Sequence, residues 1–214
     1  MKKSLIDLKI GFGLILRSKR LKSLFLINST LWGLISLTAT YQIVLLNNIE
    51  VPAYYIGIIL AFLEFSTGRG SKKATLFNKK FKNRSLTYVG LLVSVSTLVA
   101  GLAAISRIPF AIIISIIIIC YTLRAIAKGL YSVLTSRYLS NFTDSENITQ
   151  IFAANGITNS IGRTVVNFIG AQLLLHMSIE HAMLWIGITF SILILLIAKL
   201  IKNKVGHAPK ILSS

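Results

Sequence analysis

Apolar positions along this chain gather into long runs that short polar or basic segments separate. A helix needs about 20 apolar residues to cross the roughly 30 Å hydrocarbon core of a bilayer. The runs lie at residues 24–46, 54–65, 86–105, 110–123, 151–175 and 182–198. The second is short, and its helix is expected to continue past the membrane surface. Soluble domains carry apolar residues as stripes rather than as runs, so the pattern predicts an all-α, polytopic membrane bundle of six transmembrane helices.

The segment before the first run has a different, amphipathic pattern. Between Ser4 and Leu16, the apolar residues Leu5, Leu8, Phe12 and Ile15 fall on one helical face. Residues 1–22 are therefore expected to form a short N-terminal amphipathic helix, either lying in the membrane interface or packed on the base of the bundle. Residues 23–201 would form the bundle, and residues 202–214 a cytoplasmic tail.

The charges indicate how the bundle is oriented. The 214 residues are 54% hydrophobic and carry a net charge of +17. Basic residues cluster at 2–22, 69–84 and 199–210, whereas the three turns on the other side contain a single base, Arg107. This is the positive-inside pattern, and anionic lipid on the cytoplasmic side attracts such clusters. It predicts a multi-pass protein of the cell membrane with both termini cytoplasmic and the lipid bilayer, not nucleic acid, as its partner.

The fifth run contains a polar stripe. Four polar residues stand four positions apart, and four apolar residues repeat at the same spacing on the opposite side of the helix. The polar set is Asn155, Asn159, Arg163 and Asn167, and the apolar set is Ile157, Ile161, Val165 and Ile169. An Arg at the bilayer centre costs roughly 3 kcal/mol on the insertion scale. The stripe is therefore predicted to face a protein interior or a water-filled path, where it would either line a solute path or hold helices together.

Other polar residues within or beside the runs are candidates for function. Tyr41 and Gln42 lie in the outer part of the first run and would face a solute, unless Tyr41 is an interfacial anchor. Glu64 is either a proton-coupling carboxylate or the partner of a base such as Arg69 or Lys128. Arg124 and Lys128 are expected to extend from the inner boundary toward water. Thr143 or Asp144 is expected to cap the fifth run's helix.

The sequence offers little for catalysis or metal binding. The single cysteine, Cys120, excludes an internal disulfide and a thiolate cluster. His176, Glu180 and His181 share one short turn without a fourth ligand. Ser, His and Asp residues are scattered over both sides of the membrane, so no hydrolytic triad is expected. The chain is not expected to be an enzyme or to need a cofactor or metal.

The order of these features resembles the C-terminal half of a major facilitator superfamily transporter of the bacterial drug-efflux type. The opening at 14–37 is similar to the linker and seventh helix of that family. The segment 68–84 occupies the place of its glycine-and-arginine loop but lacks the expected Asp, and 137–170 resembles its inner loop and eleventh helix. The resemblance implies transport of a small solute by alternating access between two six-helix halves.

Because this chain has the length of one half, the resemblance implies that a second six-helix half, from a second copy or a separate chain, completes it. The alternative is that the chain is a truncated product without transport activity. A different class of function also fits the residues: a non-transporting membrane scaffold or partner subunit that uses the polar stripe for assembly.

Overall fold

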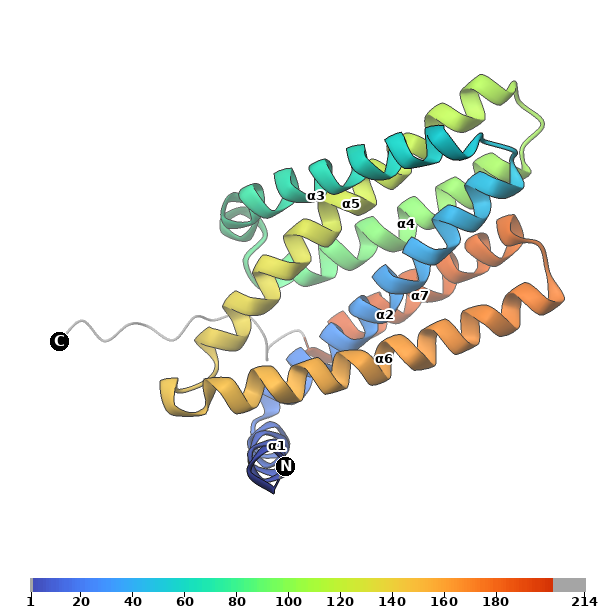
Figure 1. The fold of residues 1–214 in the computed structure, drawn as a ribbon. Helices are drawn as coiled ribbons and strands as arrows, with labels where there is room; N and C mark the ends of the chain where they lie inside the picture. The colour runs from blue at the N-terminus through green and yellow to red at the C-terminus, as the bar shows by residue number, and fades with distance from the viewer. Residues whose placement is uncertain (1, 202–214) are drawn as a thin grey trace.

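The computed structural model describes residues 2–201, and in this range the chain is almost entirely helical (Figure 1). Short 3-10 turns lie at Lys82–Arg84 and Ser145–Asn147. The α-helices are α1 (Lys2–Arg17), α2 (Lys19–Asn48), α3 (Ala53–Phe81), α4 (Ser85–Ile105), α5 (Phe110–Asn141), α6 (Ile148–His176) and α7 (Ile179–Ile201). The all-α prediction is confirmed for these residues, and the expected tail at 202–214 lies outside them.

Helices α2 to α7 run up and down as one bundle, and their connections alternate between its two ends (Figure 1). One end holds the α3–α4 and α5–α6 connections and the start of α2, together with bases such as Lys19, Lys80 and Arg84. The other end holds the three short turns with Glu50 and Arg107. The bundle thus places the basic clusters within the described residues together, as the charge pattern predicted.

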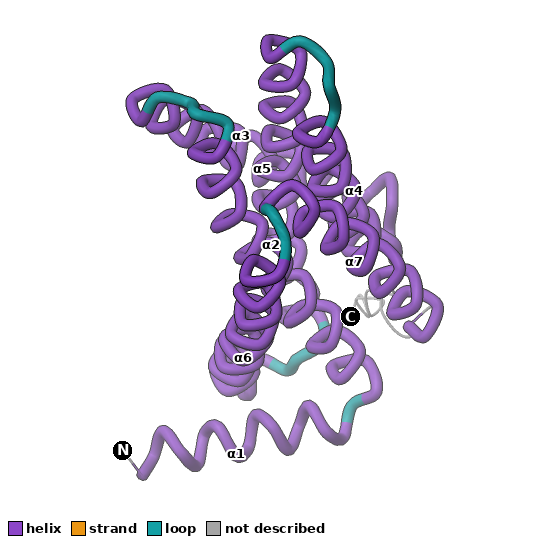
Figure 2. Tube along the Cα trace, turned by 90° about the vertical axis from the view of Figure 1, so that its right-hand side faces the viewer, coloured by secondary structure: helices purple, strands orange, loops and turns teal. Residues whose placement is uncertain are grey.

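Helix α1 lies across the basic end of the bundle rather than along it (Figure 2). Ser18 separates it from α2 and caps α2, because its side chain accepts a hydrogen bond from the backbone N–H of Leu21. Gly11 of α1 lies against the backbone of Gln150 in α6. The N-terminal amphipathic helix therefore packs on the base of the bundle, one of the two placements that the sequence allowed.

Four helices are long and apolar enough to cross a membrane, namely α2, α4, α5 and α7. Helices α3 and α6 are of similar length but more polar. The prediction of six spans is therefore confirmed only in part: six long helices form, and four of them are apolar enough to span a membrane. Much of the expected basic loop at 69–84 is helix, since α3 continues to Phe81. Lys and Arg are good helix formers, and the charge that ends an apolar run does not end a helix.

The helices pack in pairs that repeat between the two halves of the chain. Helix α6 packs on α2, α3 packs on α5, and α4 packs on both α5 and α7, while α2 also contacts α7 and α5. Exchanging α2, α3 and α4 with α5, α6 and α7 leaves these pairings unchanged, whereas the smaller contact between α2 and α4 has no comparable counterpart between α5 and α7. Because the two triplets run in opposite directions, this is the pairing expected of an inverted three-helix repeat.

Glycines bring the paired helices into backbone contact. A Cβ at Gly129 of α5 would overlap the carbonyl oxygen of Thr67 in α3. A Cβ at Gly162 of α6 would stand 2.7 Å from the carbonyl oxygen of Ser29 in α2, closer than real Cβ atoms come. Small residues at such contacts are the usual means by which membrane helices pack closely.

Candidate functional site

The centre of the polar interior is Asn28 on α2, which connects three helices. Its Nδ2 donates to Oδ1 of Asn155 on α6 at 3.3 Å, and its Oδ1 accepts from the hydroxyl of Thr135 on α5 at 3.1 Å. The hydroxyl of Tyr131 donates to the backbone oxygen of Asn28 at 3.2 Å, and its ring stacks on Trp32. Asn28 and Asn155 are both buried. These bonds tie α2 to α5 and to α6 through buried polar side chains.

The four residues of the predicted polar stripe on α6 differ in burial. Asn155 is buried against Asn28, and Asn167 is half-buried and donates from Nδ2 to the hydroxyl of Ser36 on α2 at 3.2 Å. Asn159 is half-buried as well, while Arg163 is exposed and forms no hydrogen bond or ion pair within residues 2–201. On the opposite side Ile161, Val165 and Ile169 are exposed and Ile157 is half-buried. Because Arg163 is exposed too, the bundle covers only part of the stripe that was predicted to face a protein interior.

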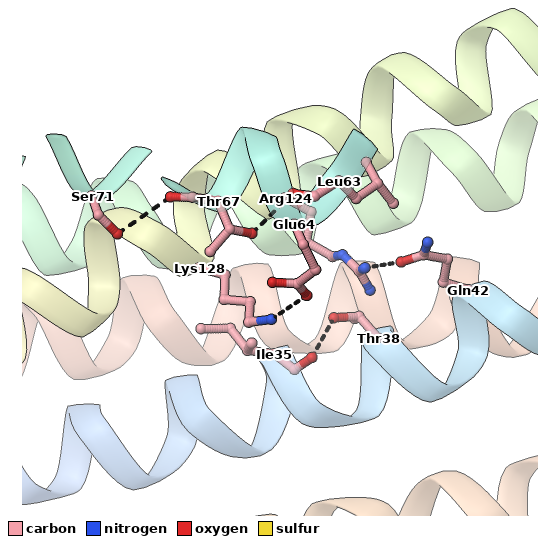
Figure 3. Close-up of polar contacts among 9 residues, drawn as sticks. All are labelled: Ile35, Thr38, Gln42, Leu63, Glu64, Thr67, Ser71, Arg124 and Lys128. Atoms are coloured by element: carbon pink, nitrogen blue, oxygen red, sulfur yellow. Dashed lines mark hydrogen bonds and ion pairs between the residues drawn. The ribbon is translucent and has the colours of Figure 1, made fainter. Parts of the chain in front are cut away.

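A second polar contact joins α5 to α2 (Figure 3). Nη2 of Arg124 donates to Oε1 of Gln42, and the guanidinium stands 5.4 Å from the centre of the Tyr121 ring. Arg124 is 8% exposed and Gln42 1% exposed. The expectation that Arg124 extends to water at the inner boundary was therefore wrong, because α5 continues to Asn141 and leaves Arg124 inside the bundle.

Glu64 forms an ion pair with Lys128, at 2.7 Å between Oε1 and Nζ (Figure 3). Their side chains are 69% and 39% exposed, so both lie on a surface of the bundle. Glu64 stands about 16 Å along α3 from Ala53 at the rise of an α-helix, which is near half the thickness of a bilayer. The structure thus places Glu64 with one of the bases that the sequence proposed as its partner.

Tyr41 has a structural contact. Its side chain is 1% exposed, and its hydroxyl donates to the backbone oxygen of Gly170 on α6 at 2.6 Å. It therefore holds α2 against α6 and is not an interfacial anchor. Gln42, its neighbour in sequence, faces α5 instead, so the two adjacent residues serve different helix pairs.

The exposed polar groups gather on one side of the bundle. At about 100° per residue, Arg163 lies roughly 40° from Asn159 and from Asn167, and Asn167 faces α2. Lys128 lies roughly 40° from Arg124, which also faces α2. We call this side the polar face; it comprises Ser36 on α2, Glu64 on α3, Lys128 on α5, and Asn159, Arg163 and Asn167 on α6.

The surface of α4 and α7 has the opposite character. Large exposed side chains there include Val95, Val99, Leu102, Trp185 and Ile192. Such residues suit contact with acyl chains, whereas an exposed ion pair and an exposed Arg would not. Large apolar side chains are also exposed on α3, α5 and α6, so the polar face is a polar region within a largely apolar surface.

The turn that contains His176, Glu180 and His181 forms hydrogen bonds to protein side chains. The ring Nδ1 of His181 pairs with the hydroxyl of Ser178 at 2.9 Å, and Glu180 accepts from Nδ2 of Asn48. No group of three potential metal ligands comes together in the part of the chain that the structure describes.

Comparisons of the chain with protein-family models, curated proteins and solved structures found no match. Function is therefore inferred from the arrangement of the polar face and the interior beneath it.

Proposed function

We propose that this chain is one half of a membrane transporter of the major facilitator type, in which a second six-helix body closes over the polar face. A small solute would cross the membrane between the two bodies by alternating access. The observation that carries the proposal is the ion pair Glu64–Lys128 together with Arg163, which is exposed and has no partner within residues 2–201. All three lie near the middle of long helices in a largely apolar bundle.

The cost of exposing those charges supports a covered face. Charged side chains within the hydrocarbon region almost always face a protein interior or a water-filled path. If the bundle stood alone, Glu64, Lys128 and Arg163 would contact acyl chains. A second body with its own polar face would remove this cost and leave a hydrated path between the two.

Unpaired groups on the polar face support a path for a polar solute. The Oδ1 atoms of Asn159 and Asn167 are buried and accept no hydrogen bond within the described residues. Each is an acceptor that water or a solute hydroxyl could satisfy once the path opens, and Arg163 nearby is a donor. The inverted pairing of α2–α4 and α5–α7 also supports the proposal, because many transporters place their binding sites at such repeat interfaces.

The simplest second body is another copy of this chain, placed in the same membrane with the same orientation. A two-fold axis along the membrane normal would bring two polar faces together. Because Arg163 and Glu64 lie on different helices of that face, the pairing would allow an Arg of one copy to approach an acid of the other.

Alternating access can be tested without knowing the solute. Ser160 is exposed on α6, about 60° around the helix axis from Arg163 of the polar face and about 18 Å from Ile148. In a Cys120→Ala background, Ser160→Cys should react with a membrane-impermeant maleimide applied to either side of the membrane in turn. The matched control is Val95→Cys on the apolar side, which should remain unreactive to the charged reagent.

The labelling pattern separates transport from scaffolding. Reaction of Ser160→Cys from both sides supports an alternating path. Reaction from neither side, with folded protein present in normal amount, would indicate a closed assembly surface and reject transport in favour of the scaffold. Reaction from one side alone would also reject alternating access.

A further inference from the structure

We propose that Arg124, Gln42 and Tyr121 form a binding site for a small monoanion, specifically the carboxylate of an organic acid. This inference rests on the proposed function for its biological meaning, since it names the class of solute that would be carried. The site is distinct from the Arg163 stripe that the sequence indicated. It lies between α2 and α5, directly beneath the polar face.

Hydrogen-bond donors without acceptors are the first evidence. Nη1 of Arg124, Nε2 of Gln42 and the hydroxyl of Tyr121 are all buried and form no hydrogen bond within the described residues. Leaving a buried donor unpaired costs about 1–3 kcal/mol, and more for a charged one. All three groups belong to residues that are more than nine-tenths buried. Gln42 is hydrogen-bonded to the guanidinium of Arg124, and the centre of the Tyr121 ring lies 5.4 Å from that guanidinium.

The charge at this place is the second evidence. The guanidinium of Arg124 contacts a neutral amide oxygen and an aromatic ring, and the nearest acid, Glu64, is already paired with Lys128. Of the six acidic residues in the sequence, the other five lie in α1 or at the two ends of the bundle. The group of Arg124, Lys128 and Glu64 thus carries one net positive charge, and no further acid pairs with it within the part of the chain that the structure describes.

The chemistry of the donors favours a carboxylate. A planar guanidinium binds a carboxylate through parallel N–H bonds, and charge-assisted bonds of this kind are the strong ones. The amide N–H of Gln42 and the phenol of Tyr121 would supply further donors to the same two oxygens. One net positive charge matches a monoanion, so a dianion such as phosphate monoester would leave negative charge unbalanced.

Access to the site would come from the polar face. Tyr121 lies about 20° from Lys128 around the helix axis but is only 2% exposed, so a solute would reach the site when α2 and α5 move apart. The solute would reach Arg124 by displacing Gln42 from Nη2 or by adding to the free Nη1. Figure 3 shows Arg124 and Gln42 pointing toward each other between α5 and α2, with Glu64 and Lys128 beside them.

The test is a binding measurement on the purified full chain in detergent. Thermal unfolding would be followed while sodium acetate or sodium benzoate replaces an equal concentration of sodium chloride. Acetamide and benzamide, which have the same shapes without the charge, are the matched controls. A saturable rise in Tm with a carboxylate and none with its amide is expected. The absence of such a rise with both acids would overturn the proposal.

Variants locate the site. Arg124→Gln should weaken carboxylate binding by about tenfold or more, and Arg137→Gln on the same helix should leave it unchanged. If Arg124→Gln does not fold, Tyr121→Phe removes one hydroxyl from a ring that stays in place and should weaken binding about threefold to tenfold. Binding that Tyr121→Phe and every folded Arg124 variant retain at full affinity would place the anion elsewhere and reject the site.

The two proposals fail in different ways. Carboxylate binding that depends on Arg124, combined with Ser160→Cys labelling from one side only, would keep the anion site and reject transport. Labelling from both sides without carboxylate binding would keep transport and reject the anion site.

Discussion

The side-chain amide of Asn28 on α2 bonds to that of Asn155 on α6 across 3.3 Å, while the same Asn28 accepts from Thr135 on α5. One buried residue thus satisfies polar groups on two other helices. Through Asn28 the bundle joins Asn155, which lies 127 positions later in the sequence, and Thr135, which lies 107 positions later.

Replacing Asn28 should destabilise the bundle. Asn28→Leu would leave Thr135 and Asn155 buried without these partners, and we expect a loss of about 1–3 kcal/mol of unfolding free energy. Thermal or denaturant unfolding in detergent measures it. The control is Thr30→Ala on the same helix, whose hydroxyl bonds only to the backbone oxygen of Leu26. The double variant Asn28→Leu/Asn155→Leu should lose about 0.6 kcal/mol less unfolding free energy than the sum of the losses in the two single variants. Full additivity would show that the bond contributes nothing.

The pair Glu64–Lys128 should behave as a unit. Glu64→Gln or Lys128→Gln leaves one charge at membrane depth, so each is expected to lower the yield of folded, monodisperse protein. The double variant removes both charges and should recover most of that yield. Lys72→Gln, an exposed base farther along α3, is the control and should have no effect. Single variants with normal yield would mean that the pair faces bulk water.

The contact between α3 and α5 should not tolerate a methyl group at Gly129. Gly129→Ala forces the two backbones apart, and we expect about 1–3 kcal/mol of destabilisation. Gly68→Ala, on α3 where nothing lies within 4 Å, is the matched control. It should be neutral or slightly stabilising, because Ala is the better helix former. Equal effects at both positions would contradict the close approach.

The orientation of the bundle can be checked with single cysteines. In a Cys120→Ala background, Lys79→Cys at the basic end of α3 and Glu50→Cys in the α2–α3 turn should react with an impermeant reagent from opposite sides of the membrane. Labelling of both from the same side would contradict both the up-and-down arrangement and a cytoplasmic position for the basic end.

A completed transporter should contain two bodies. If the second body is another copy, native mass spectrometry in mild detergent should give twice the 23.5 kDa of one chain. Reversing the charge with Arg163→Glu on the polar face should reduce that dimer, whereas Lys72→Glu should not. A stable monomer that still shows two-sided labelling at Ser160→Cys would exclude a second copy as the covering body.

Hydropathy predicted the helices well because local composition decides where an apolar helix forms. The outward position of Ile161 and Val165 also followed from spacing alone. The ends of the helices were harder to predict. The basic residues after Phe65 suggested a loop, but Lys and Arg favour helix and α3 continues through them to Phe81. Neither Thr143 nor Asp144 caps α6, since Asn147 precedes it and a short 3-10 turn intervenes.

The interior contacts could not be predicted from sequence because they depend on which helices become neighbours. Arg124 follows a run of apolar residues, which gave it the appearance of a boundary residue. Its partner Gln42 is 82 positions earlier, and only the packing of α5 on α2 brings them together. Asn28 stood out no more than the other polar residues of its run. The pattern on α6, by contrast, correctly predicted which side of that helix is apolar.

The glycine contacts also constrain how this protein can change shape. Gly129 allows α5 to pack closely on α3, and Gly162 allows α6 to pack closely on α2, so each helix pair is expected to move as a rigid unit. A change of shape would then occur at the interface between the two pairs, which the hydrogen bonds Asn28–Thr135 and Gln42–Arg124 cross. Amide, hydroxyl and guanidinium groups can exchange such bonds for water, so we expect the two helix pairs to separate most readily along this interface if the protein changes shape.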